Sequence, residues 1–321
     1  MHTSAVAVVL SAFAGLAQAH AGPHARGMPW TFDPWIVVPL LVSAALYGSG
    51  ALRVALRSRR TALHARRIGC FCAGWLVLAV ALVSPLHAAG EHSFAAHMLE
   101  HELLMLVGAP LLVLGRPLGF FAWALPLSLR RAGGSVERQS VFASVWGFLT
   151  HPVSATVLQA VALWAWHAPG PFDLALAHEG WHAVQHLSFL VTALLFWTAV
   201  LDGHRIAARP ALAIGCLFAT ALVGGALGAL MAFSWSPWYA AYAALGLTPF
   251  GLTPVQDQQL AGLLMWIPGG VIHAGAALAI ALGLLRRLRD QETAAPDGAV
   301  SLAEPVYAGG GGPSLQRQRG G

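Results

Sequence analysis

The sequence contains no lysine and few charged residues of any kind. Of its 321 residues, 10% are charged and 57% are apolar, whereas charged residues make up roughly 25% of an ordinary soluble protein. This balance excludes an ordinary soluble domain and indicates a chain that lies mostly within a lipid bilayer. All 18 basic residues are arginines in short clusters between apolar runs, so we expect no continuous basic face and no nucleic-acid partner.

Cysteine is also scarce. The three cysteines, Cys70, Cys72 and Cys216, are too few for a disulfide framework. Cys70 and Cys72 are two residues apart and point to different faces of a helix, so we interpret them as small packing residues rather than as a thiolate relay for Cu(I).

Long apolar runs fill most of the chain. A helix needs about 20 mostly apolar residues to cross roughly 30 Å of hydrocarbon while satisfying its own backbone. Seven runs qualify, so we predict an all-α polytopic membrane protein with seven transmembrane helices. The runs are Trp35 to Leu52, Ile68 to Leu86, Ala95 to Leu114, Pro152 to His167, Ala183 to Leu201, Ala211 to Phe233 and Gln259 to Leu285.

The flanking segments set the expected domain boundaries. Residues 1–19 carry a short apolar run that ends in Ala17-Gln18-Ala19, which resembles a signal peptidase site, so we expect a cleaved signal peptide. An uncleaved eighth helix is the alternative. The membrane domain then covers residues 20–289, and the Gly- and Pro-rich residues 290–321 are expected to form a disordered cytoplasmic tail.

Arginine positions predict the orientation, because short cytoplasmic loops collect positive charge. When the first span starts outside at Trp35, 17 of the 18 arginines fall in cytoplasmic segments and only Arg26 lies outside. We therefore expect the mature N-terminus outside and the C-terminus in the cytoplasm.

Histidine is the polar residue in excess, with 15 in the chain. On the predicted topology ten of them lie on the outer side, most at the outer ends of the third, fourth and fifth spans. Residues four apart share one face of a helix, and two such stripes occur. They are His97, His101 and Met105 on the third span, and His178, His182 and His186 at the start of the fifth.

Imidazole stripes beside a thioether suit a late transition metal, because imidazole binds copper and zinc and methionine favours Cu(I). We predict a metal site for copper, with zinc less favoured. The candidate ligands are His97, His101, Met105, His167, His178, His182, His186 and His273. Hydrogen bonds to loop carbonyls, or across helices for His273, are the alternative roles, and His87 and His92 are expected to be solvated loop side chains.

Two other functions stay open. The segment from His178 to His182 matches H-E-x-x-H, in which two histidines bind zinc and the glutamate, here Glu179, is the general base of a hydrolase. A haem-binding electron carrier with His101 and His186 as axial ligands is the second alternative. Because such matches arise easily in a histidine-rich chain, we expect a protein that is not an enzyme.

Four motifs resemble those of the multi-spanning CtaG-type cytochrome c oxidase assembly proteins, in the same order. They are HMLEHELLMLVGAPLLVLGRP (His97 to Pro117), WAWHAPGPF (Trp164 to Phe172), HEGWHAVQHLSF (His178 to Phe189) and DQQLAGLLMWIPGGVIHA (Asp257 to Ala274). By position, the family's His, Met and Asp pattern falls on the eight candidate ligands and on Asp257.

The resemblance implies a protein of the bacterial plasma (inner) membrane that is required for maturation of a haem-copper oxidase. Oxidase subunits and periplasmic copper chaperones are the expected partners, within the lipid bilayer. Copper insertion is the step that we infer. The expected primary ligands are His97, His101, His182 and His186, the exchange ligands His167 and His178, and the deeper soft ligand Met105.

Overall fold

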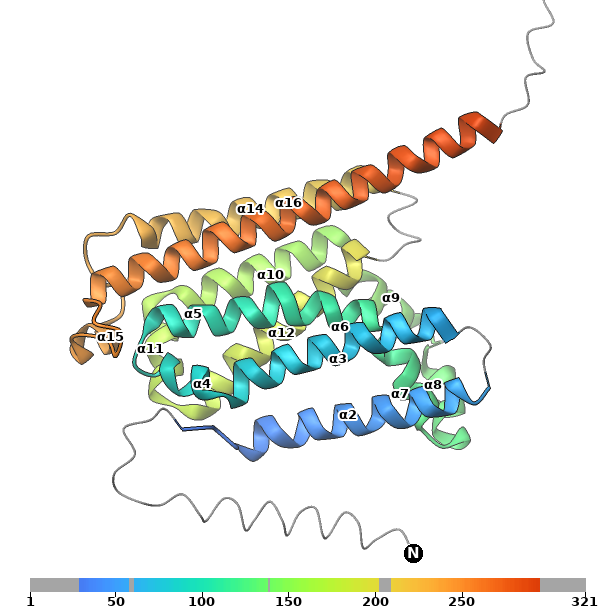
Figure 1. Cartoon of the computed structure of the whole chain (residues 1–321), viewed down its shortest axis with the longest axis horizontal. Coiled ribbons are helices and arrows are strands. Elements are labelled where there is room, and N and C mark those ends of the chain that lie inside the picture. The colour runs from blue at the N-terminus through green and yellow to red at the C-terminus, as the bar shows by residue number, and fades with distance from the viewer. Residues whose placement is uncertain (1–28, 58–60, 138, 202–208, 295–321) are drawn as a thin grey trace, which may run out of the picture. The chain divides into compact units, whose positions relative to one another are not determined.

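The computed structural model describes residues 29–57, 61–137, 139–201 and 209–294, and every regular element in these ranges is a helix (Figure 1). The chain divides into two units, residues 1–281 and residues 282–321. The expected signal peptide at 1–19, and residues 295–321 of the expected tail, lie outside the described residues.

The helices follow one another with short connections. They are α2 (Pro34–Ala55), α3 (Thr61–Val83), α4 (Pro85–Gly90), α5 (Phe94–Glu102), η1 (Leu103–Gly108), α6 (Ala109–Gly115), α7 (Pro117–Ala124), α8 (Leu127–Glu137), α9 (Ser140–Leu149), α10 (Pro152–His167), α11 (Pro169–Ala177), α12 (Glu179–Leu201), α14 (Pro210–Ala232), α15 (Ala240–Leu245) and α16 (Pro254–Ala294). The π-helix η1 joins α5 and α6 into one continuous helix.

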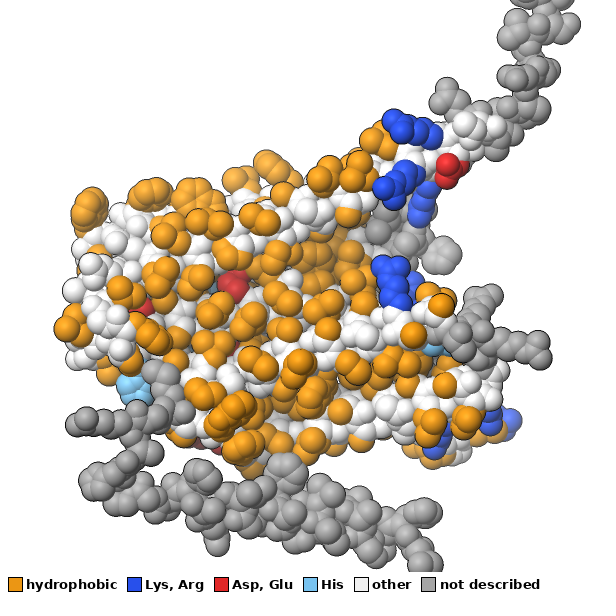
Figure 2. Space-filling model, in the orientation of Figure 1, with side chains coloured by type: hydrophobic (Ala, Val, Ile, Leu, Met, Phe, Trp, Pro, Cys, Tyr) orange, Lys and Arg blue, Asp and Glu red, His pale blue; other side chains and the backbone are white. Residues whose placement is uncertain are grey.

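Within the described residues, six helices are long and apolar enough to cross a membrane. They cover Pro34–Ala55, Ala62–Val83, Phe94–Gly115, Glu179–Leu201, Pro210–Ala232 and Pro254–Gln291. A seventh crossing exists if α9 and α10, which meet at 63°, form one broken span; α10 alone is only about 24 Å long. The predicted all-helical fold with several candidate membrane spans is confirmed, and the count of seven stays a prediction. Hydrophobic side chains cover the flank of the helices (Figure 2).

Proline begins several helices, where its missing N–H costs no hydrogen bond. Pro85 and Pro169 start the short helices α4 and α11, which gather with the start of α5 at one end of the first unit (Figure 1). We call this the histidine end. The opposite end, with Arg53 at the end of α2 and Arg116 after α6, is called the arginine end.

Small residues bring α14 and α16 together. A Cβ atom placed on Gly228 of α14 would lie 2.6 Å from the carbonyl oxygen of Gly262 of α16, so only glycine fits there. Lipid tails provide no hydrophobic drive between helices, and such close backbone contact is the usual source of stability in membranes. This contact helps to fix the part of α16 that lies in the first unit.

Candidate metal centre

Asp257 of α16 holds the N-terminus of α5. Its carboxylate accepts hydrogen bonds from the Ser93 hydroxyl at 2.8 Å and from the backbone N–H of Phe94 at 2.6 Å. The Asp257 side chain is buried, and the free N–H groups and dipole of a helix N-terminus are what stabilise an anion there. This interaction fixes the position of α5 and therefore of His97 and His101.

Among the described residues, six imidazoles that are buried or partly buried gather at the histidine end. They belong to His87 of α4, His97 and His101 of α5, His167 at the end of α10, and His182 and His186 of α12. The two i, i+4 pairs lie side by side: ring centroids are 5.1 Å apart between His97 and His182 and 4.8 Å apart between His101 and His186. The predicted stripes of α5 and α12 therefore face each other.

Three of these histidines could hold one metal ion. Each of His97, His182 and His186 offers a ring nitrogen that lies within 4.8 Å of the other two. We call these residues the triad. Because metal–nitrogen bonds are about 2 Å long, small side-chain movements would bring all three nitrogens onto one ion.

The ring nitrogens are poorly satisfied by the protein itself. The Nε2 atoms of all three triad residues are buried without a hydrogen-bond partner, and so are both ring nitrogens of His101. His97 and His101 are each only 1% exposed, so water does not replace the missing partners at the surface. A buried polar atom without a partner costs about 1–3 kcal/mol, and a bound metal ion is one way to recover that energy.

Glu100 lies beside the triad, fully buried. Its Oε1 atom is 2.8 Å from His87 Nδ1 and 3.8 Å from His186 Nδ1, while its Oε2 atom has no partner. Burial alone lowers the pKa of His87, but the hydrogen bond and the charge of Glu100 outweigh burial and raise it. His87 therefore donates its Nδ1–H to Glu100, in the manner of a carboxylate that orients an imidazole near a metal.

Sequence reasoning missed His87 and the role of Glu100. His87 was expected to be a solvated loop residue, yet it is 9% exposed and its ring stacks 5.5 Å from that of His182. The Ser84-Pro85 pair, an N-cap followed by a first-position proline, was the one local sign that His87 lies on a helix. Nothing local indicated that this helix folds against α5.

His167 pairs with a methionine that the sequence analysis did not select. Its Nδ1–H donates to the Leu163 carbonyl oxygen at 2.7 Å, which leaves Nε2 as an acceptor, and Nε2 is 3.3 Å from Met98 Sδ. The His101 and His167 ring centroids are 6.4 Å apart. A lone pair facing a thioether is a donor set that suits a soft cation.

The other predicted ligands lie apart from the triad. His178 is exposed in the extended residue between α11 and α12, outside the helix that carries His182. Met105 and His273 are buried and line a separate small cavity with residues of α10 and α14. Met105 also lies in the π-helix η1, which the four-residue spacing did not predict.

The alternative functions receive no support from this geometry. The H-E-x-x-H pattern needs both histidines on one helix, but α12 begins at Glu179, so His178 precedes it, and Glu179 is exposed. For haem, the rings of His101 and His186 stand edge to face at 4.8 Å. That separation leaves no room for a macrocycle between them.

Aromatic side chains pack over the histidine end. Tyr239 stacks on Phe172 with ring centroids 4.0 Å apart and donates to the His167 carbonyl oxygen at 2.8 Å. Tyr242, in α15, donates to the Gly90 carbonyl oxygen at 2.6 Å. Burial, with the charges of Asp257 and Glu100, raises the pKa of Tyr242, so this side chain stays a neutral donor.

The fold and the site together define a helical, multi-pass membrane protein with a buried histidine cluster at one end. The family of cytochrome c oxidase caa3 assembly factors, Caa3_CtaG, matches residues 45–287. The chain belongs to this family, as the four motifs predicted.

Similar proteins occur in mycobacteria. Uncharacterized proteins of Mycobacterium bovis and Mycobacterium tuberculosis are each 30% identical over 244 residues, and one of Mycobacterium leprae is 29% identical over 252 residues. Each match covers 74% of this chain and 36% of the relative, so the chain spans about a third of the length of these relatives. No solved structure matches the chain.

Changing Asp257 to Asn should destabilise the protein, because the charged cap of α5 is lost and an amide N–H then faces backbone N–H donors. A hydrogen bond to a charged group is worth about 1.5–3 kcal/mol, so thermal unfolding in detergent should begin at a clearly lower temperature. Asp290→Asn, an exposed change on the same helix, is the control. Equal unfolding temperatures for the two variants would show that the cap does not hold α5.

Proposed function

We propose that this protein is an oxidase assembly factor, which binds copper at the triad of His97, His182 and His186 and passes it to a subunit of a haem-copper oxidase. The observation that carries the proposal is the convergence of three imidazoles from two helices, each with a buried Nε2 atom that has no hydrogen-bond partner. If these histidines served only to stabilise the fold, their ring nitrogens would be paired with protein groups, as most buried polar atoms are.

The surroundings of the triad favour Cu(I) over Zn²⁺. Imidazole binds both ions, but the thioether of Met98 next to His167 suits the softer one. Charge adds a second reason, because Glu100 supplies one buried negative charge beside the triad. One carboxylate balances Cu(I), whereas Zn²⁺ would leave a net charge in a low-dielectric site, which is costly.

Six histidines exceed the number that one ion needs, and this surplus suits transfer. His101, whose ring nitrogens are both unpartnered, lies 4.4 Å from His97 and 4.8 Å from His186 between ring centroids. An ion can therefore exchange one imidazole for the next without losing all its ligands at once. His178, exposed at the same end, is the proposed entry ligand that receives copper from a periplasmic chaperone.

The proposed orientation puts the histidine end in the periplasm and the arginine end in the cytoplasm of a bacterium with this protein in its inner membrane. Arginine is retained on the cytoplasmic side by its cost of translocation, and Arg53 and Arg116 lie at the end opposite the histidine cluster. A periplasmic site is accessible to copper chaperones and to the periplasmic parts of oxidase subunits.

Replacing all three triad histidines with alanine should remove one equivalent of copper per chain. The full-length protein and the variant would be purified in detergent, loaded with Cu(I) without oxygen, and analysed for metal. His92→Ala is the matched control, because His92 lies at the same end but is exposed. Equal copper in the triple variant and the unchanged protein would refute the proposed site.

Changing Glu100 to Gln should weaken Cu(I) binding roughly 10- to 100-fold, the usual effect of losing an outer carboxylate beside a metal site. The substitution keeps the size of the side chain but removes the charge beside the triad. Competition with a coloured Cu(I) chelator measures the affinity. Glu91→Gln makes the same charge change at an exposed position nearby, and an equal effect from both variants would contradict the role of Glu100.

Two matched cysteine substitutions test the orientation in a variant whose native cysteines are replaced by serine. Gly170 of α11 and Gly133 of α8 both have open space at the Cβ position. In cells whose outer membrane is permeabilised and whose inner membrane is intact, a membrane-impermeant maleimide should label Gly170→Cys but not Gly133→Cys. Labelling of Gly133→Cys alone would reverse the proposed orientation.

A further inference from the structure

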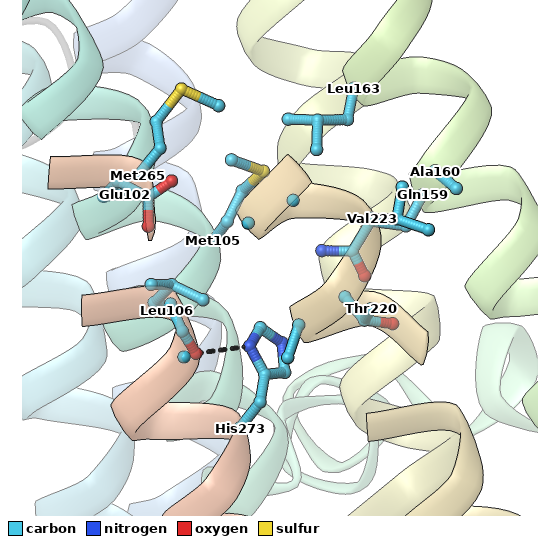
Figure 3. A pocket seen from close by; sticks show the side chains of 15 residues that line it. Glu102, Met105, Leu106, Gln159, Ala160, Leu163, Thr220, Val223, Met265 and His273 are labelled. Carbon is cyan, nitrogen blue, oxygen red and sulfur yellow. Dashed lines mark hydrogen bonds between the residues drawn. The ribbon is translucent and has the colours of Figure 1, made fainter. Parts of the chain in front are cut away.

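A second group of polar side chains lies deeper in the first unit, within the membrane-spanning helices. A cavity of about 40 Å³ is lined by residues of four helical segments, among them Glu102, Met105, Gln159, Thr220 and His273. Figure 3 shows Met105 in the middle of this group, with Gln159 and Thr220 on one side and His273 below. The volume admits a bare ion with a water molecule or two, but no ion with a full hydration shell.

Four of the lining side chains have a buried polar atom without a partner. These atoms are Glu102 Oε2, Gln159 Oε1, Thr220 Oγ1 and His273 Nε2. A helical threonine commonly returns its hydroxyl to a carbonyl four residues earlier, yet Thr220 makes no such bond. Because a polar side chain is costly inside a membrane and tends to serve a function there, these atoms, brought together from four segments, indicate a shared ligand.

The protein holds the His273 ring and the Met105 backbone in place. His273 donates its Nδ1–H to the Gly269 carbonyl oxygen at 2.7 Å, so Nε2 carries the free lone pair (Figure 3). Trp197 stacks on the His273 ring with centroids 5.6 Å apart and planes at 9°, and its Nε1–H donates to the Met105 carbonyl oxygen at 2.9 Å. One tryptophan therefore contacts both the ring of His273 and the backbone of Met105.

The charge and the donor atoms of the lining residues favour a soft monovalent cation as the ligand of this cavity. No arginine is among the described residues that line the cavity, so Glu102 has no basic partner there. One carboxylate balances one positive charge, and a divalent ion would stay unbalanced in an apolar surrounding. An imidazole nitrogen with the thioethers of Met105 and Met265 selects Cu(I) over Na⁺ or K⁺, which prefer several oxygen ligands.

We propose that this cavity is a second copper site, in which His273 Nε2 and Met105 Sδ bind Cu(I) and the Glu102 carboxylate balances its charge. The inference rests on the proposed function and extends it, because Met105 follows His101 on the same continuous helix. Cu(I) moves between the triad and this site by exchange of neutral ligands, without change of oxidation state, and in the purified protein each site also takes Cu(I) directly from solution.

Copper stoichiometry tests this site in the full-length protein. Cu(I) is titrated without oxygen against a coloured chelator, and we expect two equivalents for the unchanged protein. His273→Ala and Met105→Leu should each lose one equivalent, the triple triad variant should lose the other, and the combined variant should bind none. Thr156→Val removes another buried, unpartnered hydroxyl outside the cavity and should keep both equivalents.

The outcomes separate the two proposals. No copper in the unchanged protein refutes the proposed function itself. One equivalent, lost in the triad variant but kept in His273→Ala and Met105→Leu, leaves the triad in place and overturns the second site.

X-ray absorption of the copper-loaded triad variant adds a direct measure of the ligands. We expect a sulfur neighbour that disappears in Met105→Leu, a change that preserves side-chain size. A copper spectrum that is unchanged by Met105→Leu overturns the proposed ligand set, even if His273→Ala fails to fold.

Discussion

The contact between the Asp257 carboxylate and the first turn of α5 is the interaction on which both groups of polar side chains depend. It joins the last long helix to the third candidate span, and these two helices carry His97 and His101 at one end and Met105 and His273 further along. A buried anion at a helix N-terminus is stabilised by the free N–H groups and by the dipole. Because the carboxylate must meet those N–H groups, the part of α16 in the first unit has one fixed register relative to α5.

The same local hydrogen bond orients an imidazole at the histidine end and another in the deeper cavity. His167 and His273 each donate Nδ1–H to the carbonyl oxygen four residues earlier, those of Leu163 and Gly269, at 2.7 Å. The bond fixes the tautomer and leaves Nε2 as an electron-pair donor that points away from its own helix. In an apolar interior this arrangement offers a metal ligand without burying a charge, and it explains how a membrane protein can keep several histidines away from water.

Much of the architecture and part of the site could be predicted from local patterns. Apolar runs predicted the long helices, and four-residue spacing predicted that His97 pairs with His101 and His182 with His186, as the ring contacts show. His87 could not be assigned in this way, because its place depends on how α4 folds back onto α5 and α12. The π-helix around Met105 was equally hidden, since it arises from packing rather than from residue type.

The sequence by itself determined that the chain crosses a membrane several times, that it belongs to an oxidase assembly family, and which helix faces carry imidazoles, because hydropathy, motifs and helical periodicity are all local properties of the chain. Only the tertiary structure decided which imidazoles meet and which remain exposed. It brought Glu100 to His87 and Glu102 to the cavity of His273, and left His178 at the surface. The physical reason is that burial and the loss of hydrogen-bond partners are set by neighbouring helices, whose relative register no single segment encodes.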